Sequence, residues 1–159
     1  MLTFLNLEAE GFCSIESLHL QLNPTCTILI KAPNGKGKST ILSALVWAIY
    51  GKNLKGVSEV NTWKQVRPKD YKGTKVQVYF QKDSHTYKIV RCQKYDEVLE
   101  DGAKGKDRLI FMKDGDIVDI KGKGKIQDFI NREIGLSYTL FMNSIMFGQG
   151  IKRLIQESN

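Results

Sequence analysis

One stretch of the sequence decides the fold: Leu29-Ile30-Lys31-Ala32-Pro33-Asn34-Gly35-Lys36-Gly37-Lys38-Ser39-Thr40-Ile41-Leu42. It begins as a short apolar, β-prone run, passes through a glycine-rich loop and ends in a helix-like apolar pattern. Gly35 and Gly37 give the backbone the freedom to turn so that successive N–H groups cradle an anion. The order of strand, Gly-Lys-Ser loop and helix predicts a phosphate-binding loop and hence a nucleoside-triphosphate binder.

The predicted phosphate loop spans residues 32–40, and its residues have distinct expected roles. The Lys38 ammonium is expected to reach the β- and γ-phosphates, and the Ser39 hydroxyl to ligate Mg²⁺. The helix that follows directs the positive end of its dipole at the phosphate. Ala32 stands where the first glycine of G-x-x-x-x-G-K-[ST] is usual, and alanine is tolerated there if its φ is negative. The expected phosphate contacts are Asn34, Gly35, Lys36, Gly37, Lys38, Ser39 and Thr40.

Length and composition favour one compact domain with a real core, because the chain has 159 residues and is 42% hydrophobic. No apolar run approaches the ~20 residues of a membrane span, and the N-terminus lacks the basic region of a signal peptide. Three isolated cysteines, Cys13, Cys26 and Cys92, indicate reduced thiols in a cytosolic protein.

The net charge of +7 comes from clustered basic residues. These clusters suit nucleic-acid phosphates, but a soluble lysine-rich surface explains them equally well. Both interpretations stay open. The clustered residues are Lys64, Arg67, Lys69, Lys72 and Lys75, then Lys104, Lys106 and Arg108, then Lys121, Lys123 and Lys125.

Alternating and continuous apolar patterns predict the strands. A first hairpin is expected from strands at 5–9 and 18–22, followed by a buried strand at 25–31. Strands at 76–80 and 87–92 should form a second hairpin. A third hairpin is expected around Asp114-Gly115.

Helical periodicity predicts a first helix whose face carries Ile41, Leu45, Ala48 and Ile49, with Gly51 as its C-terminal cap. A long loop should follow at 54–73, and a second helix at 126–134 should end at Gly135. Ser137 could cap a short helix that carries Leu140 and Phe141. A short buried strand is then expected at 144–147, before a final helical pattern from residue 151. This order predicts an α/β fold and not the regular βα alternation of a small nucleotide kinase.

Four stretches together resemble the N-terminal ATPase half of SMC-like DNA repair ATPases, specifically the SbcC type. They are the opening hairpin at 6–22, the loop Pro33-Asn34-Gly35-Lys36-Gly37-Lys38-Ser39-Thr40, the hairpin at 76–91 with its V-x-F and Y-x-I-x-R patterns, and the stretch 141–150. The sequence Phe147-Gly148-Gln149-Gly150-Ile151 resembles the Q-loop of this family. The resemblance covers essentially the whole chain, and a phage or bacterial recombination ATPase fits it.

The resemblance implies a P-loop NTPase of the ABC/SMC head type, with a mixed central sheet, an antiparallel β-layer and a C-terminal helical part. Residues 1–159 would then be a single N-terminal lobe, with the Q-loop at 147–150. Gln149 is expected to ligate Mg²⁺ or to orient the attacking water, because an amide offers both an acceptor oxygen and donor hydrogens. A polar turn residue is the alternative interpretation of Gln149.

Thr62, Trp63 and Lys64 fall where the family contacts the base or ribose of the nucleotide. Trp63 either stacks on that nucleotide or is packed in the core, and the sequence does not choose between the two. Cys13 follows Phe12 where the family often has an arginine that touches the nucleotide. That side-chain contact is therefore missing, or only the backbone at Cys13 contacts the nucleotide.

The acidic Walker B strand and the signature loop of an ABC-class ATPase are missing from the sequence. The apolar run at 109–112 before Asp114 imitates a Walker B strand, but a hairpin turn explains it better. In the family these motifs follow a long coiled coil. The sequence therefore predicts half of a split site, with the coiled coil and the C-terminal lobe outside the chain.

The expected function is the ATP-binding half-site of a DNA repair and recombination ATPase that regulates a partner nuclease at double-strand breaks. ATP and Mg²⁺ are the expected ligands, and Lys38 and Gln149 the expected catalytic residues. The expected partners are the missing C-terminal lobe, a second copy in an ATP-sandwiched dimer, the nuclease and double-stranded DNA, in the cytoplasm and without a membrane. The alternatives are a RecF- or RecN-like ATPase, a P-loop nucleotide kinase, and a DNA-binding module whose loop touches only DNA phosphates.

Overall fold

The computed structural model describes residues 2–22 and 36–147, with the backbone alone for 36–39 and 144–147. The strand predicted at 25–31, Cys26, and the stretch from residue 148 onward lie outside the described residues. No helix within the described ranges is both long and apolar enough to cross a membrane. The elements are β1 (Leu2–Phe12), β2 (Ile15–Gln21), α1 (Lys36–Tyr50), the 3₁₀ turn η1 (Lys64–Val66), β3 (Thr74–Lys82), β4 (His85–Gln93), β5 (Tyr95–Val98), β6 (Lys104–Lys106), β7 (Leu109–Lys113), β8 (Asp116–Ile117), α2 (Lys123–Ile134) and α3 (Tyr138–Phe147).

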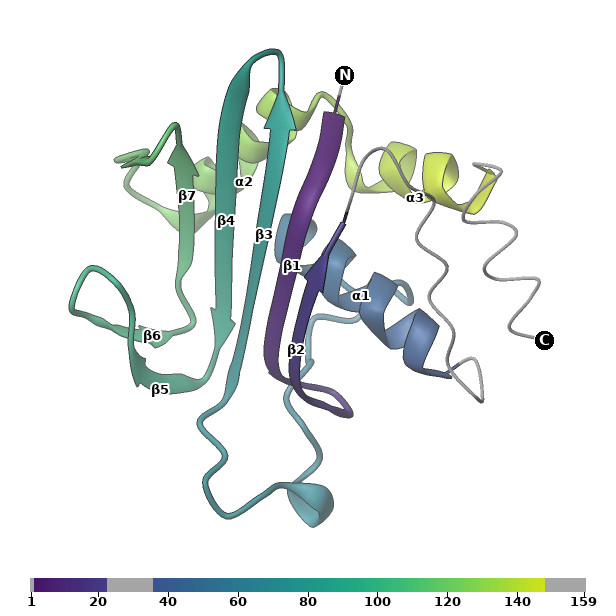
Figure 1. Ribbon diagram of the computed structural model, residues 1–159, viewed down its shortest axis with the longest axis vertical. Helices are drawn as coiled ribbons and strands as arrows, with labels where there is room; N and C mark the ends of the chain where they lie inside the picture. The colour runs from purple at the N-terminus through teal and green to yellow at the C-terminus, as the bar shows by residue number, and fades with distance from the viewer. Residues whose placement is uncertain (1, 23–35, 148–159) are drawn as a thin grey trace.

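A six-stranded sheet in the order β2-β1-β3-β4-β7-β8 forms the centre of the molecule (Figure 1). All strand pairs between described residues are antiparallel, which confirms the three predicted hairpins. Two of their turns place successive residues at positive φ, Asp83 and Ser84 before β4, and Asp114 and Gly115 before β8. That geometry matches the right-handed twist of the flanking strands. The sheet was expected to be mixed. The strand predicted at 25–31, which could provide a parallel pair, lies outside the described residues.

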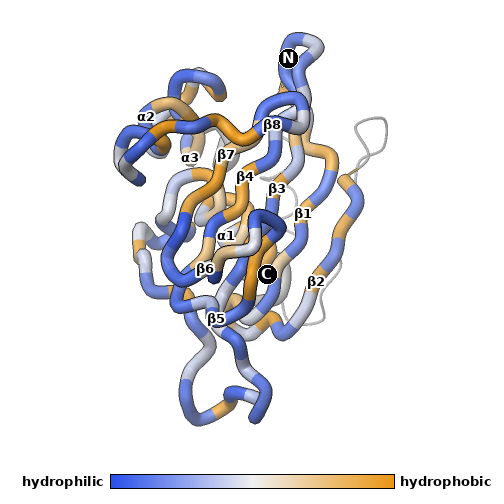
Figure 2. The backbone as a smooth tube through the Cα atoms, turned by 90° about the vertical axis from the view of Figure 1, so that its left-hand side faces the viewer, coloured by the Kyte–Doolittle hydropathy of each residue, from blue (hydrophilic) through white to orange (hydrophobic). Residues whose placement is uncertain are grey.

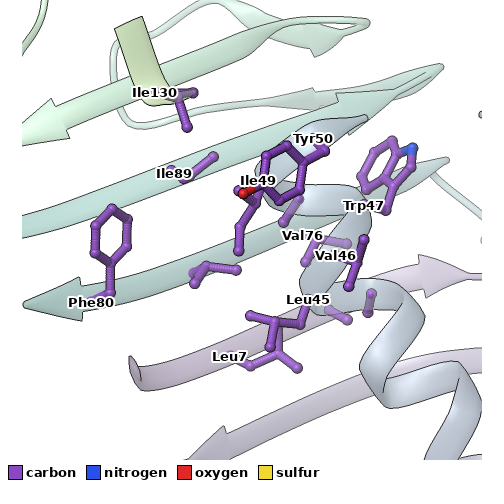
Figure 3. Close-up of a cluster of buried hydrophobic side chains, with 14 of the residues drawn as sticks. Leu7, Leu45, Val46, Trp47, Ile49, Tyr50, Val76, Phe80, Ile89 and Ile130 are labelled. Atoms are coloured by element: carbon purple, nitrogen blue, oxygen red, sulfur yellow. The ribbon is translucent and has the colours of Figure 1, made fainter. Parts of the chain in front are cut away.

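One face of the sheet carries the core, and α1 covers that face (Figure 3). Leu7 of β1, Val76 and Phe80 of β3 and Ile89 of β4 point toward the helix and are almost fully buried. The alternation predicted for these strands is therefore confirmed, because every second residue faces the core. The helix itself is buried around most of its circumference: besides the predicted Leu45, Ala48 and Ile49, the buried residues are Leu42, Ala44, Val46, Trp47 and Tyr50.

The C-terminal end of α1 is held by polar side chains from elsewhere in the fold. Gly51 has a φ of +77° and donates its N–H to the Trp47 carbonyl at 2.7 Å, as expected for a C-terminal cap. The Arg91 guanidinium of β4 donates to the carbonyls of Ala48 at 3.0 Å and Ile49 at 3.2 Å. Gln127 of α2 also donates to the Ile49 carbonyl, at 2.8 Å, and accepts from Arg91. Burial lowers the pKa of Arg91 to about 10, so the side chain remains protonated at neutral pH.

Two elements differ from the sequence prediction. The small hairpin of β5 and β6 was not predicted, because its strands are charged and short and show no apolar alternation. The strand predicted at 144–147 is wrong, because α3 continues as a helix to Phe147. Neither glycine nor proline interrupts the chain between Phe141 and Phe147, so each added residue extends an existing helical hydrogen-bond ladder instead of starting a new element.

We expect Ser137→Ala to destabilise the protein by about 1 kcal/mol, because the Ser137 hydroxyl accepts a hydrogen bond from the Leu140 N–H at 3.2 Å at the start of α3. Thermal unfolding monitored by circular dichroism should show a Tm lower by about 2–4 °C. Ser17→Ala, at an exposed position of β2, is the matched control. An equal shift in the two variants would contradict the capping role.

Candidate nucleotide-binding site

The helix that follows the predicted phosphate loop is present as α1, which begins at Lys36. It starts two residues before Lys38, so Lys38, Ser39 and Thr40 lie in its first turns. The first N–H groups of a helix have no partner within the helix, and the dipole there favours an anion. The backbone of α1 therefore places the Gly-Lys-Ser segment at an end of the helix suited to phosphate.

Several predicted site residues lie outside what the structure describes. Asn34, Gly35 and Gln149 lie outside the described residues, and only the backbone is described for residues 36–39. The described part of the chain holds no cluster of three or more His, Cys, Asp or Glu residues suited to a metal ion. The assignment of Ser39 and Gln149 to Mg²⁺ stays a prediction.

The segment that leads toward Gln149 is anchored on the core. Phe141 of α3 is buried and packs against the rings of Tyr50 and Phe4, with centroid distances of 5.4 and 6.2 Å. The Tyr138 hydroxyl donates to the Asn53 carbonyl at 2.7 Å, just after α1 ends. The N-terminal half of α3 is thus fixed against the C-terminal end of α1.

Trp63 is not part of the core, since 78% of its surface is exposed. The core alternative for this residue is therefore wrong, and the stacking alternative stays a prediction. Its neighbour Thr62 is only 8% exposed, and Lys64 begins the 3₁₀ turn η1. The three predicted residues are adjacent on one loop, but Thr62 is buried and Trp63 is exposed to solvent.

The first hairpin turn and the predicted base-side loop lie side by side. The N–H of Cys13 donates to the Val60 carbonyl at 2.8 Å, and the Thr62 hydroxyl donates to the Cys13 carbonyl at 2.7 Å. Phe12 and Asn61 form a β-bridge next to these bonds. The Cys13 backbone, which stands where the family has an arginine, therefore holds the loop. Burial, followed by the charge of Glu59, raises the pKa of the Cys13 thiol.

A hollow of about 990 Å³ opens beside this loop, which is large enough for a nucleoside. Its lining combines an aromatic ring, Trp63, with basic and polar groups from three parts of the chain. Residues that line the hollow include Cys13, Asn53, Glu59, Thr62, Trp63, Lys64, Arg67 and Lys94. An exposed aromatic face beside positive charge can stack a base and attract an anionic nucleotide.

The basic clusters are partly neutralised within the fold. Lys72 pairs with Glu97 at 3.2 Å, Lys75 with Glu10 at 3.7 Å and Lys104 with Asp96 at 2.8 Å. Arg108 also pairs with Asp101. Figure 2 shows the loop between α1 and β3, at the bottom of the view, as mostly hydrophilic. These pairs favour the interpretation of a solvated surface for part of the positive charge.

The remaining polar signals have structural explanations. Asp114 lies in the β7–β8 turn, as predicted, and does not imitate a Walker B residue. Its carboxylate accepts the Thr86 N–H at 2.9 Å and lies 2.7 Å from the His85 ring nitrogen, so it attaches this turn to the start of β4. Three further residues were not predicted from the sequence, although their side chains hold the base-side loop: Asn61, Tyr71 and Gln93. The one local signal was an aromatic residue, Tyr71, in a largely polar and basic loop that also carries Trp63.

Sequence comparisons place these features among known proteins. A family model described as an AAA domain, AAA_23, matches residues 6–159. The probable DNA double-strand break repair Rad50 ATPase of Aquifex aeolicus (strain VF5) is 27% identical over 157 residues, which make up 98% of this chain and 15% of the relative. The DNA double-strand break repair Rad50 ATPase of Methanopyrus kandleri is 23% identical over 156 residues, which make up 94% of this chain and 16% of the relative. The chain thus spans about one sixth of the length of these relatives.

Solved structures of the recombination mediator protein RecF share the fold. RecF with ATP matches with a TM-score of 0.52 and 19% identity, covering 79% of this chain and 30% of RecF. RecF with ATPrS gives the same TM-score and identity, and the match covers 29% of that chain. Together with the family model, these matches confirm the predicted fold class and the resemblance to an SMC-like repair-ATPase head.

Proposed function

The chain belongs to the AAA_23 family of AAA domains, and from that membership we propose that it is the ATP-binding N-terminal lobe of a DNA repair and recombination ATPase head. The observation that carries the proposal is the family match over residues 6–159, within which the Gly-Lys-Ser sequence leads into a helix. The similarity to two DNA double-strand break repair Rad50 ATPases supports the same class of activity.

In this proposal, residues 34–40 hold the triphosphate. Lys38 stabilises the charge that develops on the transferring γ-phosphate, while Trp63 and Lys64 contact the base or ribose. Ser39 and Gln149 would hold Mg²⁺, which neutralises phosphate charge when bound. The lobe is one half of a split site, so residues from a C-terminal lobe and a second copy complete it.

At the level of the whole protein, we propose that ATP clamps two heads together, forms a surface for double-stranded DNA and gates a partner nuclease in the cytoplasm. A phage or bacterial source fits this role. The second candidate is a RecF-like recombination ATPase, which the shared fold with RecF favours. The parent gene discriminates between the two, because the SbcC type requires a long heptad region after the head, which a RecF-like protein lacks.

Isothermal calorimetry of the 159-residue chain with ATP tests the proposal. We expect weak binding that requires Mg²⁺ and little steady hydrolysis, because half of the site is missing. Hydrolysis at an ordinary enzymatic rate by this chain alone would contradict the split site. If ATP does not bind, the measurement is repeated with the C-terminal lobe added, and failure there too would overturn the phosphate-loop interpretation.

A further inference from the structure

A buried polar network holds the loop that carries Trp63, and its protons can be assigned. The Gly11 carbonyl accepts hydrogen bonds from the Tyr71 hydroxyl at 2.8 Å and from the Thr74 hydroxyl at 2.6 Å. A hydroxyl has a single proton to donate, so both oxygens act only as acceptors toward their other neighbours. Tyr71 then accepts the backbone N–H of Thr62 at 2.9 Å.

The same assignment of donors and acceptors fixes the orientation of the Asn61 amide. Its NH₂ group faces the Thr74 hydroxyl at 2.9 Å, the Gln93 carbonyl at 3.0 Å and the Tyr71 hydroxyl at 3.2 Å. All three are acceptors, so the nitrogen and not the oxygen must point at them. Asn61 is only 6% exposed, and its side-chain oxygen has no partner among the described residues. The network therefore stabilises a single orientation of this side chain.

Gln93, at the end of β4, holds the backbone of the loop at residues 58–61. Its side-chain oxygen accepts the N–H groups of Val60 at 2.8 Å and Asn61 at 3.2 Å, and its NH₂ donates to the Ser58 carbonyl at 2.8 Å. Residues 58–61 are thus attached to the end of β4 by one amide. A loop tied in this way has already lost much of the conformational entropy that ligand binding would otherwise cost.

Thr62 marks the point where the fixed part of the loop ends. Its N–H donates to Tyr71, its hydroxyl donates to the Cys13 carbonyl, and its own carbonyl accepts from Arg67 at 2.6 Å. Arg67 also lies over the Tyr71 ring, 4.7 Å from its centroid. The next residue, Trp63, projects into solvent beside the hollow described above.

Resting on the proposed function, we propose that Tyr71, Asn61 and Gln93 are positioning residues that fix Trp63 and Lys64 at the base side of the nucleotide. The network lies beside the first hairpin turn, and its members contact residues 58–62. The contribution of the base to ATP affinity therefore depends on it, whereas the contribution of the triphosphate does not.

The experiment compares the affinities of ATP and inorganic tripolyphosphate, both with Mg²⁺, for the 159-residue chain and its variants. Tyr71→Phe removes only the hydroxyl and should weaken ATP binding about tenfold while tripolyphosphate binding changes less than about twofold. Gln93→Met is a second variant with the same expectation. Tyr95→Phe is the control, because it also removes only a tyrosine hydroxyl, but one that donates to the Glu10 carboxylate instead of holding residues 58–62.

Acrylamide quenching of tryptophan fluorescence distinguishes a positioning role from a merely structural one. The chain has two tryptophans, and since Trp47 is 2% exposed, quenching reports Trp63. ATP should protect Trp63 in the wild type and in Tyr95→Phe, but less in Tyr71→Phe, and tripolyphosphate should protect it in none of them.

An equal loss of ATP and tripolyphosphate affinity in folded Tyr71→Phe and Gln93→Met would overturn this inference alone. Unchanged affinity of these two variants for both ligands would also overturn it. A change in the ratio of ATP affinity to tripolyphosphate affinity in Tyr95→Phe would do the same. If the wild-type chain bound neither ATP nor tripolyphosphate, even with the C-terminal lobe added, the proposed function would fall and this inference with it.

Discussion

Lys38→Ala is expected to weaken Mg²⁺-ATP binding on the order of 100-fold. In the proposed site, its ammonium group is the charged group of the Gly-Lys-Ser motif that would reach the β- and γ-phosphates. A hydrogen bond to a charged group contributes about 1.5–3 kcal/mol, and the loss of its long-range attraction adds to this. Because α1 begins at Lys36, the substitution lies in a helix that tolerates alanine well, so the fold should persist.

Calorimetry of ATP binding measures this effect, with Lys36→Ala as the matched control. That variant removes the same charge two residues earlier, at the first residue of α1. It should weaken binding only about threefold, because alanine keeps the backbone N–H that position 36 offers to phosphate and removes only a contribution to the general electrostatic field. Equal effects of the two substitutions would indicate nonspecific attraction of the anion and would contradict the assigned role of Lys38.

Arg91→Met is expected to cause the largest loss of stability, about 3–5 kcal/mol. Methionine keeps most of the side-chain volume but leaves the Ala48 carbonyl without the donor that Arg91 supplies, and removes one donor from Ile49 and one from Gln127. The last carbonyls of a helix have no partner within the helix, and each unsatisfied buried group costs about 1–3 kcal/mol. Arg91 is only 4% exposed, so water cannot replace it.

Urea unfolding followed by circular dichroism measures this loss. Arg132→Met is the matched control, because Arg132 lies at an exposed position of α2 over the Phe129 ring. It should change the free energy of unfolding by less than about 0.5 kcal/mol. A small effect of Arg91→Met would mean that Gly51 and Gln127 alone suffice to hold the end of α1.

Much of the fold could be predicted because its signals are local. Alternation over 76–80 and 87–92, and the turn residues Asp114-Gly115, report conformations that depend on neighbours a few positions away. Gly135 ends α2 at a φ of +79°, as predicted from its lack of a side chain. The error at 144–147 arose because short apolar runs are compatible with both a strand and a buried helix.

The candidate site was predicted only in part, because only part of it depends on local sequence signals. The phosphate loop is a contiguous motif and is visible in the sequence, whereas the support of the base-side loop is not. Tyr71 and Gly11 are 60 positions apart, and Gln93 and Asn61 are 32 apart. No periodicity links such residues, so only the folded chain shows that they meet.

The sequence by itself predicted the antiparallel hairpins and the C-terminal ends of α1 and α2, because backbone conformation at glycines, turns and caps is a local property. The tertiary structure decided that Trp63 is exposed and not packed in the core, that its neighbour Thr62 is buried, and that Arg91 holds the end of α1. Burial and hydrogen-bond partners depend on which distant segments the sheet brings together. They are properties of the assembled fold and not of any stretch of the chain.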